Sequence, residues 1–265
     1  MGQLDGKVAL VTGAAGRDNL GQKIAERLAE EGAKVVVAGR HEDELKRLAD
    51  TIGGSYCLMD LTSKEEVEAA VDFAVETYGK LDIGVNAVGW GLMKPTTETT
   101  EADLDKILAI QFKGPFFFMQ ALLRVMGEGG SIIQISSATA TIMLENHAAY
   151  MGTKAGIDHI VRTVANEYGA RGIRANSISP GLTRTPMAGP TFEMKPVMDA
   201  FEKEYPLGRV GTREDIAEAV IWLAGDKCFM TGQNLQVNGG LTLRRNPILS
   251  ELGAIMDEVT AHLQS

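Results

Sequence analysis

Short apolar runs alternate with longer amphipathic runs along almost the whole chain, and this alternation limits the fold more than any other feature. The short runs are rich in β-branched residues and apolar on both faces, as strands covered by helices on each side must be. They comprise residues 7–12, 34–39, 55–59, 82–87, 131–136, 173–179 and 234–238. The alternation predicts an α/β fold with one doubly wound parallel sheet of about seven strands.

Two of the longer runs have the pattern of helices that cover a sheet. Residues 65–79 are amphipathic and end at Gly79. Residues 21–33 contain a stop signal at Gly32 and carry an apolar stripe formed by Ile24, Ala25, Leu28 and Ala29. Both runs are therefore predicted to be surface helices whose apolar sides face the sheet.

No linker or composition break divides the chain, so residues 1–245 are predicted to form one domain. Residues 181–211 interrupt the rhythm, because they are rich in Pro, Gly and Met and are too long for a plain connection. Loops of that length are usually functional lids or disordered, and we expect a lid over a substrate site. Residues 246–265 form a separate C-terminal extension with a helical pattern.

The composition is that of an ordinary soluble enzyme, with 45% hydrophobic and 23% charged residues among 265. A formal charge of −9 without a basic stripe disfavours nucleic acid and anionic membranes as partners. Cys57 and Cys228 lie in apolar contexts without metal-ligand spacing, so we expect no metal site and buried thiols in a reducing compartment. With no apolar signal region and no apolar run near 18 residues, a cytoplasmic location is expected.

The stretch VTGAAGRDNLG, residues 11–21, follows the first strand and opens the first helix. This is the position that a phosphate-binding loop has to occupy, because free N–H groups and the positive end of the helix dipole face the pyrophosphate there. Gly13 would permit the tight turn, Gly21 would let the helix pack closely, and Asn19 is expected to adopt a left-handed backbone. The glycine spacing departs from G-x-G-x-x-G, so an ordinary tight turn is the alternative.

Three polar side chains point to carbonyl chemistry. Tyr150 and Lys154 lie four positions apart, so on a helix both project from the same face. Ser137 follows the strand at 131–136, and ligands bind at the carboxyl ends of strands in an open parallel sheet. Reduction of a ketone by hydride needs a proton donor, and a neighbouring ammonium would lower the phenol pKa from its ordinary value of ~10. Singly, these residues have structural explanations; together they indicate a catalytic trio.

With these motifs the sequence resembles the short-chain dehydrogenase/reductase family, from about Leu4 to Gly240. The matching segments are TGAAGRDNLG, Asp60 after the third strand, NAVG at 86–89, Ser137, the Tyr150-x-x-x-Lys154 pair, PGLTRTPM at 180–187, GRVGTREDIAEAVIWLA and the closing VNGG. The resemblance implies a Rossmann-type domain that carries an NAD(P)-dependent oxidoreductase. The glycine loop of this chain, TGAAGRDNLG, is two residues longer than the family's usual T-G-x-x-x-G-x-G.

The resemblance also implies residue roles. Ser137 would position the substrate carbonyl, Tyr150 would act as the acid/base, and Lys154 would lower the Tyr150 pKa and hold the nicotinamide ribose. Gln111 stands where the family has a catalytic asparagine, and its main-chain carbonyl would anchor a relay water if a helix kink exposes it. Thr185 would reach the carboxamide. The other expected cofactor positions are Gly13, Gly16, Asn19, Leu20, Gly21, Asp60, Leu61, Asn86, Ala87, Val88, Gly89, Pro180, Gly181 and Thr183.

The end of the second strand bears on which cofactor is bound. NAD enzymes place an acidic side chain there for the ribose hydroxyl, whereas this chain has Gly39 followed by Arg40. A guanidinium can pair with the 2′-phosphate of NADP, and Arg17 in the lengthened loop could share that contact. NADP(H) is therefore the predicted cofactor, with Arg40 as an ordinary solvated charge being the alternative.

Family geometry suggests a substrate pocket lined by Trp90, Met93, Met143, Leu144, His147, Met187, Phe192 and Met194. Such a surface suits an apolar or bulky carbonyl compound, since thioethers adapt to irregular shapes; local core is the alternative explanation. A 3-oxoacyl-[acyl-carrier-protein] reductase, with thin support from Arg124 and Arg171, and a non-turnover NADP sensor are alternative functions. An enoyl reductase is rejected because that group spaces Tyr and Lys seven apart, and Ile157 occupies that position.

The extension at 246–265 repeats apolar residues at helical spacing, namely Ile248, Leu249, Leu252, Ile255, Met256, Val259 and Leu263. We expect this helix to pack on a neighbouring subunit, with a cap on its own subunit as the alternative. The family resemblance implies a homotetramer, or a homodimer, joined through the helices at 100–126 and 148–169.

Overall fold

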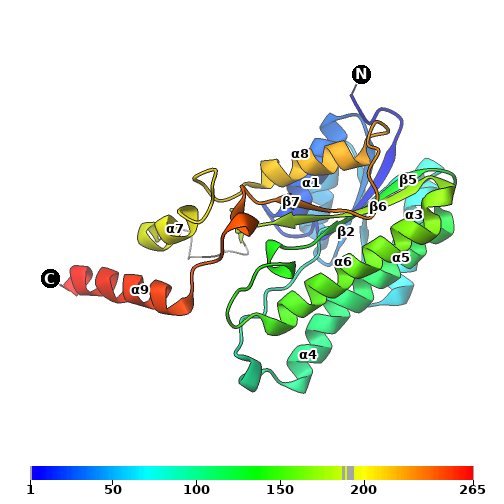
Figure 1. The fold of residues 1–265 in the computed structure, drawn as a ribbon. Helices are drawn as coiled ribbons and strands as arrows, with labels where there is room; N and C mark the ends of the chain where they lie inside the picture. The colour runs from blue at the N-terminus through cyan, green and yellow to red at the C-terminus, as the bar shows by residue number, and fades with distance from the viewer. Residues whose placement is uncertain (1, 187–188, 190–193, 265) are drawn as a thin grey trace.

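The computed structural model describes residues 2–186, 189 and 194–264. In this part of the chain, seven strands form one parallel sheet in the order β3-β2-β1-β4-β5-β6-β7 (Figure 1). The strands are β1 (Val8–Thr12), β2 (Lys34–Gly39), β3 (Ser55–Leu58), β4 (Ile83–Asn86), β5 (Gly130–Ile135), β6 (Ile173–Pro180) and β7 (Asn234–Val237). The predicted doubly wound sheet and its strands are confirmed, with boundaries shifted by no more than a residue or two.

Each connection between consecutive strands carries at least one α-helix. The helices are α1 (Leu20–Glu30), α2 (Glu42–Ile52), α3 (Lys64–Tyr78), α4 (Glu101–Leu108), α5 (Gly114–Val125), α6 (Ala148–Tyr168), α7 (Lys195–Glu202), α8 (Arg213–Ala224) and α9 (Leu249–Gln264). Gly32 and Gly79 adopt left-handed backbones just after α1 and α3, so the predicted stops are confirmed. Within the described residues, no helix combines the length and apolarity that a membrane span requires.

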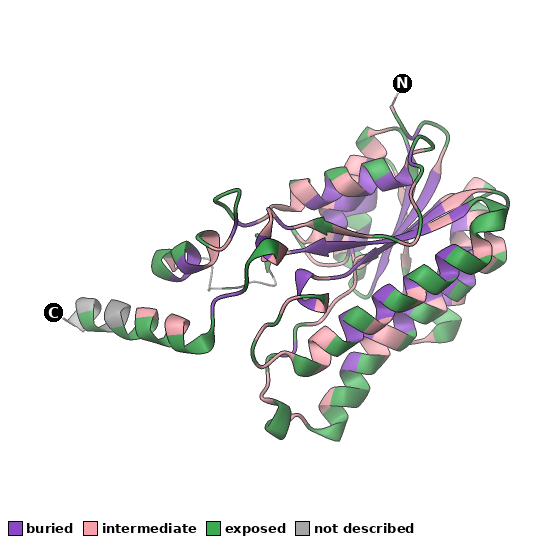
Figure 2. Cartoon of the chain, viewed as in Figure 1, coloured by how far each residue is buried: buried purple, intermediate pink, exposed green. Residues whose placement is uncertain are grey.

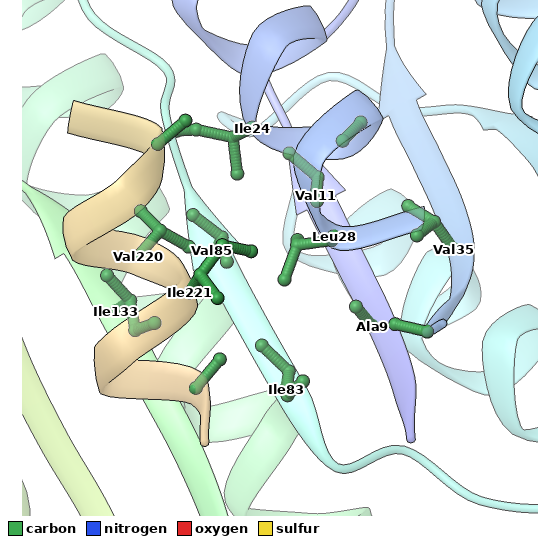
Figure 3. Packing of buried hydrophobic residues seen from close by; sticks show 14 of the residues in the cluster. Ala9, Val11, Ile24, Leu28, Val35, Ile83, Val85, Ile133, Val220 and Ile221 are labelled. Carbon is green, nitrogen blue, oxygen red and sulfur yellow. The ribbon is translucent and has the colours of Figure 1, made fainter. Parts of the chain in front are cut away.

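The helices cover both faces of the sheet and bury two apolar layers (Figure 2). One layer lies between the sheet and α1, α2 and α8, the other between the sheet and α3, α5 and α6. In the first layer, Ile24 and Leu28 of α1 and Val220 of α8 meet the side chains of Val11 and Val85 (Figure 3). Full burial of each such side chain contributes about 1.5–3 kcal/mol, which fixes the helices against the sheet.

The segment at 181–211, which was expected to be a lid over a substrate site, contains the helix α7. The ends of the segment are tied together where Gly211 N donates to Leu182 O at 3.0 Å and Arg184 N donates to Gly211 O at 2.9 Å. Its Pro and Gly residues had hidden an amphipathic helical turn, whose Val197 and Met198 are buried. The described ends of the segment therefore lie next to each other.

Candidate active site

A cleft of about 1080 Å³ lies along the carboxyl edge of the sheet. Residues that follow five different strands line it, represented by Gly13, Arg40, Asp60, Ala87 and Ser137. The strand order reverses direction between β1 and β4, and ligands of open α/β sheets bind at such a switch point. The volume is at the upper end for small-molecule sites, so an extended cofactor and a substrate both fit.

The glycine loop forms one wall of the cleft and depends on two close backbone approaches. Gly13 has a φ of 80°, and a Cβ atom there would lie 2.7 Å from the Ala87 carbonyl carbon. A Cβ atom on Gly21 would lie 2.5 Å from Gly13 O. Side chains at these two positions would push β1, β4 and α1 apart.

The left-handed residue of this loop is Asp18 and not Asn19, so that expectation was wrong. Asn19 is extended and caps α1: its side chain accepts from Gln22 N at 2.9 Å and donates to Gly13 O at 2.8 Å. Asp18 has a φ of 55°, and its carbonyl oxygen accepts from the Arg213 guanidinium of α8. An N-cap requires an extended backbone, so the turn has to be made one residue earlier.

The N-terminus of α1 suits an anion. Gly16, Asn19, Leu20 and Gly21 line the cleft there, and the first turn of α1 holds no acidic residue among those described. By contrast, α2 and α3 begin with Glu and Asp side chains that neutralise their own helix dipoles. The α1 terminus is left to attract a bound phosphate group, and the pyrophosphate of a dinucleotide fits it.

The three residues of the expected catalytic trio come together in the same cleft. Ser137 follows β5, and its Oγ lies 2.9 Å from Thr139 Oγ1. Tyr150 and Lys154 are one turn apart on α6, with Lys154 Nζ 5.7 Å from the centroid of the Tyr150 ring. The buried Lys154 ammonium donates to Ile135 O at 2.9 Å. All three side chains line the cleft, as their sequence pattern predicted.

Protonation in this pocket differs from the expectation. Burial raises the pKa of Tyr150, and its hydrogen bond with Ser137 opposes that effect only in part. We had expected the Lys154 ammonium to lower this pKa, but that group is directed at the Ile135 carbonyl. Burial also lowers the pKa of Lys154 to about 8, while the charge of Asp158 raises it. Tyr150 is therefore a protonated phenol at neutral pH.

Asp158 was missed from the sequence. It lies one turn beyond Lys154, is 4% exposed, and accepts from Ser136 Oγ at 2.9 Å and from Asn234 Nδ2 at 2.5 Å. Burial raises its pKa, and the hydroxyls of Ser177 and Ser136 counteract this. Its Oδ1 atom has no hydrogen-bond partner within the described chain. Its spacing could have indicated Asp158, because a carboxylate four positions after Lys154 lies on the same inner face of the helix.

Gln111 lies in a π-helical turn, Ala109–Lys113, between α4 and α5, so the helix kink on which its expected role depends is present. Its side chain is buried, donates to Thr153 Oγ1 at 3.1 Å and accepts from Trp90 N at 3.4 Å. Thr153 Oγ1 in turn donates to Tyr150 O at 2.8 Å. These bonds connect the π-turn to the start of the catalytic helix.

Two expected cofactor residues lie outside the cleft lining formed by the described chain, Asn86 and Arg17. Asn86 is 1% exposed beneath the cleft, where it accepts from Thr12 Oγ1 at 2.8 Å and donates to Gln134 Oε1 at 2.9 Å. Its side chain holds three neighbouring strands in register and has no face left for a ligand. Arg17 is exposed to solvent, because the left-handed turn at Asp18 directs the lengthened loop outward.

The adenosine end of the cleft is bounded by Arg40 and Asp60. The Arg40 side chain is 70% exposed, with Nη1 3.8 Å from Asp60 Oδ2. Asp60 accepts from Thr62 N at 2.9 Å, and this backbone hydrogen bond is the main cause that lowers its pKa. Further expected positions on the cleft wall are Leu61, Val88, Gly89, Pro180, Gly181, Thr183 and Thr185.

The far end of the cleft is where the sequence analysis expected the substrate pocket. Trp90, Met93, Leu144 and His147 line it, as expected. Met143, 69% exposed, and Met194, at the start of α7, are not part of the lining that the described residues form. Met143 instead presents its backbone carbonyl to Asn246, which turns its side chain toward solvent. Met187 and Phe192 lie outside the described residues.

Apolar residues that the sequence analysis missed complete this end, namely Leu182, Phe201, Leu241, Pro247, Leu249 and Leu252. The Lys106 ammonium lies 4.1 Å from the centroid of the Trp90 ring and fixes that ring at the rim. The six apolar residues come from three parts of the chain, at positions 182, 201 and 241–252. Only the folded chain brings them together.

Comparison with known proteins shows the family to which the chain is similar. A family model described as enoyl-(acyl carrier protein) reductase matches residues 13–242. The chain is 35% identical over 250 residues to D-threitol dehydrogenase of Mycolicibacterium smegmatis, covering 91% of this chain and 95% of that protein. It is 35% identical over 246 residues to a borneol dehydrogenase of Lavandula x intermedia, covering 91% and 92%.

Among solved structures, a short-chain type dehydrogenase/reductase from Mycobacterium ulcerans superposes with a TM-score of 0.89 at 31% identity, covering 94% of each chain. The chain belongs to the short-chain dehydrogenase/reductase family. Members of this family bind a nicotinamide cofactor, and the glycine loop and the uncompensated α1 terminus of this chain suit its pyrophosphate.

We predict that Asp158→Asn lowers the pKa of Lys154 below its value of about 8, because the variant removes the carboxylate charge that favours the ammonium. Lys154 would then lose its proton earlier as the pH rises. NMR titration of ¹³C-labelled lysine, with the Lys154 resonance assigned from Lys154→Arg, measures this directly. Asp226→Asn, at a side chain 77% exposed beside Lys7, is the control. An unchanged Lys154 pKa in Asp158→Asn would show that the two groups are not coupled.

Proposed function

We propose that this protein interconverts a ketone and a secondary alcohol with NADP(H), with Tyr150 as the acid/base. The observation that carries the proposal is the convergence of Ser137, Tyr150 and Lys154 on one wall of a cleft whose other wall is the glycine loop. The coarser assignment, an oxidoreductase that acts on CH–OH groups, rests on the family and on relatives named as alcohol and sugar dehydrogenases.

The bound nicotinamide would supply or accept the hydride. Ser137 Oγ donates a hydrogen bond to the substrate carbonyl oxygen, which fixes the carbonyl beside Tyr150. The raised pKa of Tyr150 keeps its proton in place, so the phenol can donate it to that oxygen during reduction. In the alcohol-oxidising direction the phenol must first lose this proton, a loss that its raised pKa opposes.

Support for NADP(H) comes from the end of β2. A Cβ atom on Gly39 would lie 2.6 Å from the Ala15 Cβ, so an acidic side chain at this position would displace the glycine loop. The exposed Arg40 guanidinium instead offers a bidentate partner for a 2′-phosphate. Family membership alone does not fix the choice between NAD and NADP, so the preference depends on these two residues.

The apolar walls favour a bulky or apolar alcohol over a polyol. Trp90, Leu144, Leu182, Phe201 and Leu252 all face the substrate end of the cleft. A borneol dehydrogenase is among the relatives, in line with this substrate class. The four-residue Tyr150–Lys154 spacing favours CH–OH chemistry over enoyl reduction, although the matching family model bears the enoyl reductase description.

A carrier-protein-bound substrate has less support. The docking surface for an acidic carrier was expected to use Arg124 and Arg171. Arg124 instead pairs with Asp72 at 2.6 Å, and Arg171 donates to the backbone carbonyls of Leu123 and Met126. Both guanidinium groups serve the packing around α5 and lie outside the cleft lining of the described chain.

For the assembly we propose a homotetramer. Leu104 and Leu108 of α4 and Phe116 of α5 are 41%, 42% and 45% exposed, an apolar surface of the kind that subunits cover. A small apolar groove, lined by residues that include Phe112 and Gly152, joins this surface to α6. These are the helices through which the family resemblance implies association.

We predict that Tyr150→Phe lowers the rate of ketone reduction by on the order of 10³-fold, because it removes only the positioned proton donor. NADPH affinity, measured by cofactor fluorescence, should stay within twofold. Tyr168→Phe on the same helix, outside the cleft lining of the described residues, is the matched control and should retain full activity. A Tyr150→Phe rate within tenfold of the parent would refute the acid/base assignment.

We predict that Arg40→Ala weakens NADPH binding by roughly 10- to 150-fold, equivalent to about 1.5–3 kcal/mol for one charge-assisted hydrogen bond. NADH binding should hardly change, since NADH lacks the 2′-phosphate. Arg162→Ala, at an exposed site on α6 away from the cleft, provides a control for the loss of charge. Tighter binding of NADH than of NADPH by the unmodified protein would overturn the NADP(H) proposal.

A further inference from the structure

Two segments about a hundred positions apart meet at the substrate end of the cleft. They are the loop at 143–147, just before the catalytic helix α6, and residues 246–252, at the start of the C-terminal extension. Asn246 Nδ2 donates to Met143 O at 2.9 Å, and Leu249 N donates to a Glu145 carboxylate oxygen at 2.5 Å. We refer to this pair of hydrogen bonds as the C-terminal clasp.

Carboxylates hold the first turn of α9 in this position. The Glu145 carboxylate accepts the free N–H of Leu249, the first residue of the helix. Glu251 accepts from Ile248 N at 3.1 Å and pairs with both terminal nitrogens of Arg245, at 2.7 and 2.9 Å. Negative groups at a helix N-terminus satisfy its free N–H donors and its dipole, so the start of α9 is anchored to its own chain.

The loop that receives the clasp is itself fixed beside the catalytic tyrosine. Asn146 has a left-handed backbone with a φ of 59°, and its carbonyl oxygen accepts from Lys94 N at 2.6 Å. His147 Nδ1 lies 2.7 Å from Glu145 O, and the His147 ring meets the edge of the Tyr150 ring at a centroid distance of 6.1 Å. The position of α9 is therefore set within a few residues of Tyr150.

The clasp brings apolar side chains of the extension to the substrate. Asn246, Pro247, Leu249 and Leu252 line the cleft, as do Leu144 and His147 of the loop that they contact. The helix α9 also contacts α7 (Figure 1). Phe201 of α7 lines the same cleft. Leu249 is 43% exposed, which leaves a hydrophobic face that a substrate can cover. The side chains of Val259 and Leu263 lie outside the described residues.

We infer that Pro247, Leu249 and Leu252 form the specificity wall of the active site in their own subunit, held in place by the hydrogen bonds of Glu145 and Asn246. Leu249 and Leu252 of this wall select alcohols with an apolar surface next to the reacting carbon. The inference rests on the proposed alcohol oxidation and adds the segment that sets its substrate range. It replaces the expectation that the start of the extension packs on a neighbouring subunit.

The first test compares Leu252→Ala with Ile248→Ala, two aliphatic truncations at the start of one helix. Ile248 is 41% exposed and lies outside the cleft lining of the described residues, so it is the matched control. With cyclohexanol, Leu252→Ala should raise KM about tenfold, as expected for lost apolar contact, while kcat stays within twofold. With propan-2-ol, which is too small to reach the wall, KM should change less than twofold. Equal KM values for cyclohexanol in the parent and Leu252→Ala would overturn the inference.

The second test measures the C-terminal clasp by amide hydrogen exchange, without any enzymatic turnover. Glu145→Ala should speed amide hydrogen exchange across residues 246–252 at least tenfold, because Leu249 N loses its acceptor. Glu145→Gln keeps an acceptor oxygen and should restore most of the protection, while Glu167→Ala, at an exposed position on α6, should leave exchange unchanged. Unchanged exchange in Glu145→Ala would overturn the clasp.

Removal of residues 246–265 distinguishes a wall within the subunit from an interface between subunits. A higher KM for cyclohexanol with an unchanged light-scattering mass supports a wall within the subunit. A smaller assembly with an unchanged KM overturns the inference and assigns the extension to a subunit interface. If the parent protein oxidises no alcohol while Glu145→Ala still loosens residues 246–252, the proposed function and the specificity role fail together, and the clasp remains as a structural contact.

Discussion

The hydrogen bond from the Lys154 ammonium to the Ile135 carbonyl joins α6, which carries Tyr150 and Lys154, to the end of β5, and the geometry of the candidate site depends on it. A buried ammonium is costly without partners, so this contact and the nearby Asp158 charge are required to keep Lys154 in place. Asp158 in turn accepts from Ser136, the neighbour of Ser137. These contacts between α6 and the end of β5 therefore fix the positions of Lys154, of Tyr150 one turn before it, and of Ser137 after β5.

The cofactor wall follows from a contrast between helices. Acidic residues neutralise the first turns of α2 and α3, whereas α1 has none within the described chain and faces the cleft. The close approach of Gly13 to the backbone of Ala87 brings this terminus to the point where the strand order reverses. Beneath it, the buried Asn86 side chain bonds to Thr12 and Gln134 and keeps β1, β4 and β5 aligned. The α1 terminus, which suits an anion, is therefore positioned by the backbone at Gly13 and by the buried Asn86 side chain beneath it.

The substrate end is built differently, from segments that connect the strands and from the C-terminal extension. Its walls come from the π-turn region, the loop at 143–147, α7 and the start of α9, and they are mainly apolar. The cofactor end depends on strand ends and glycines, which tolerate little change. Walls made of side chains on connecting segments can vary without disturbing the sheet, so substrate range and cofactor chemistry are separable in this fold.

The sequence by itself determined the strands, the helix stripes and the Tyr150–Lys154 pair, because these follow from local periodicity and from a spacing of one helical turn. The glycine loop was recognisable from its position between a strand and a helix. Tertiary structure alone decided that Asp18 makes the left-handed turn, that Asn86 is buried, and that Tyr150 has a raised pKa. It also decided that Glu145 holds the extension at the cleft. Burial, and hydrogen bonds between residues distant in sequence, govern these features, and neither leaves a periodic pattern in the chain.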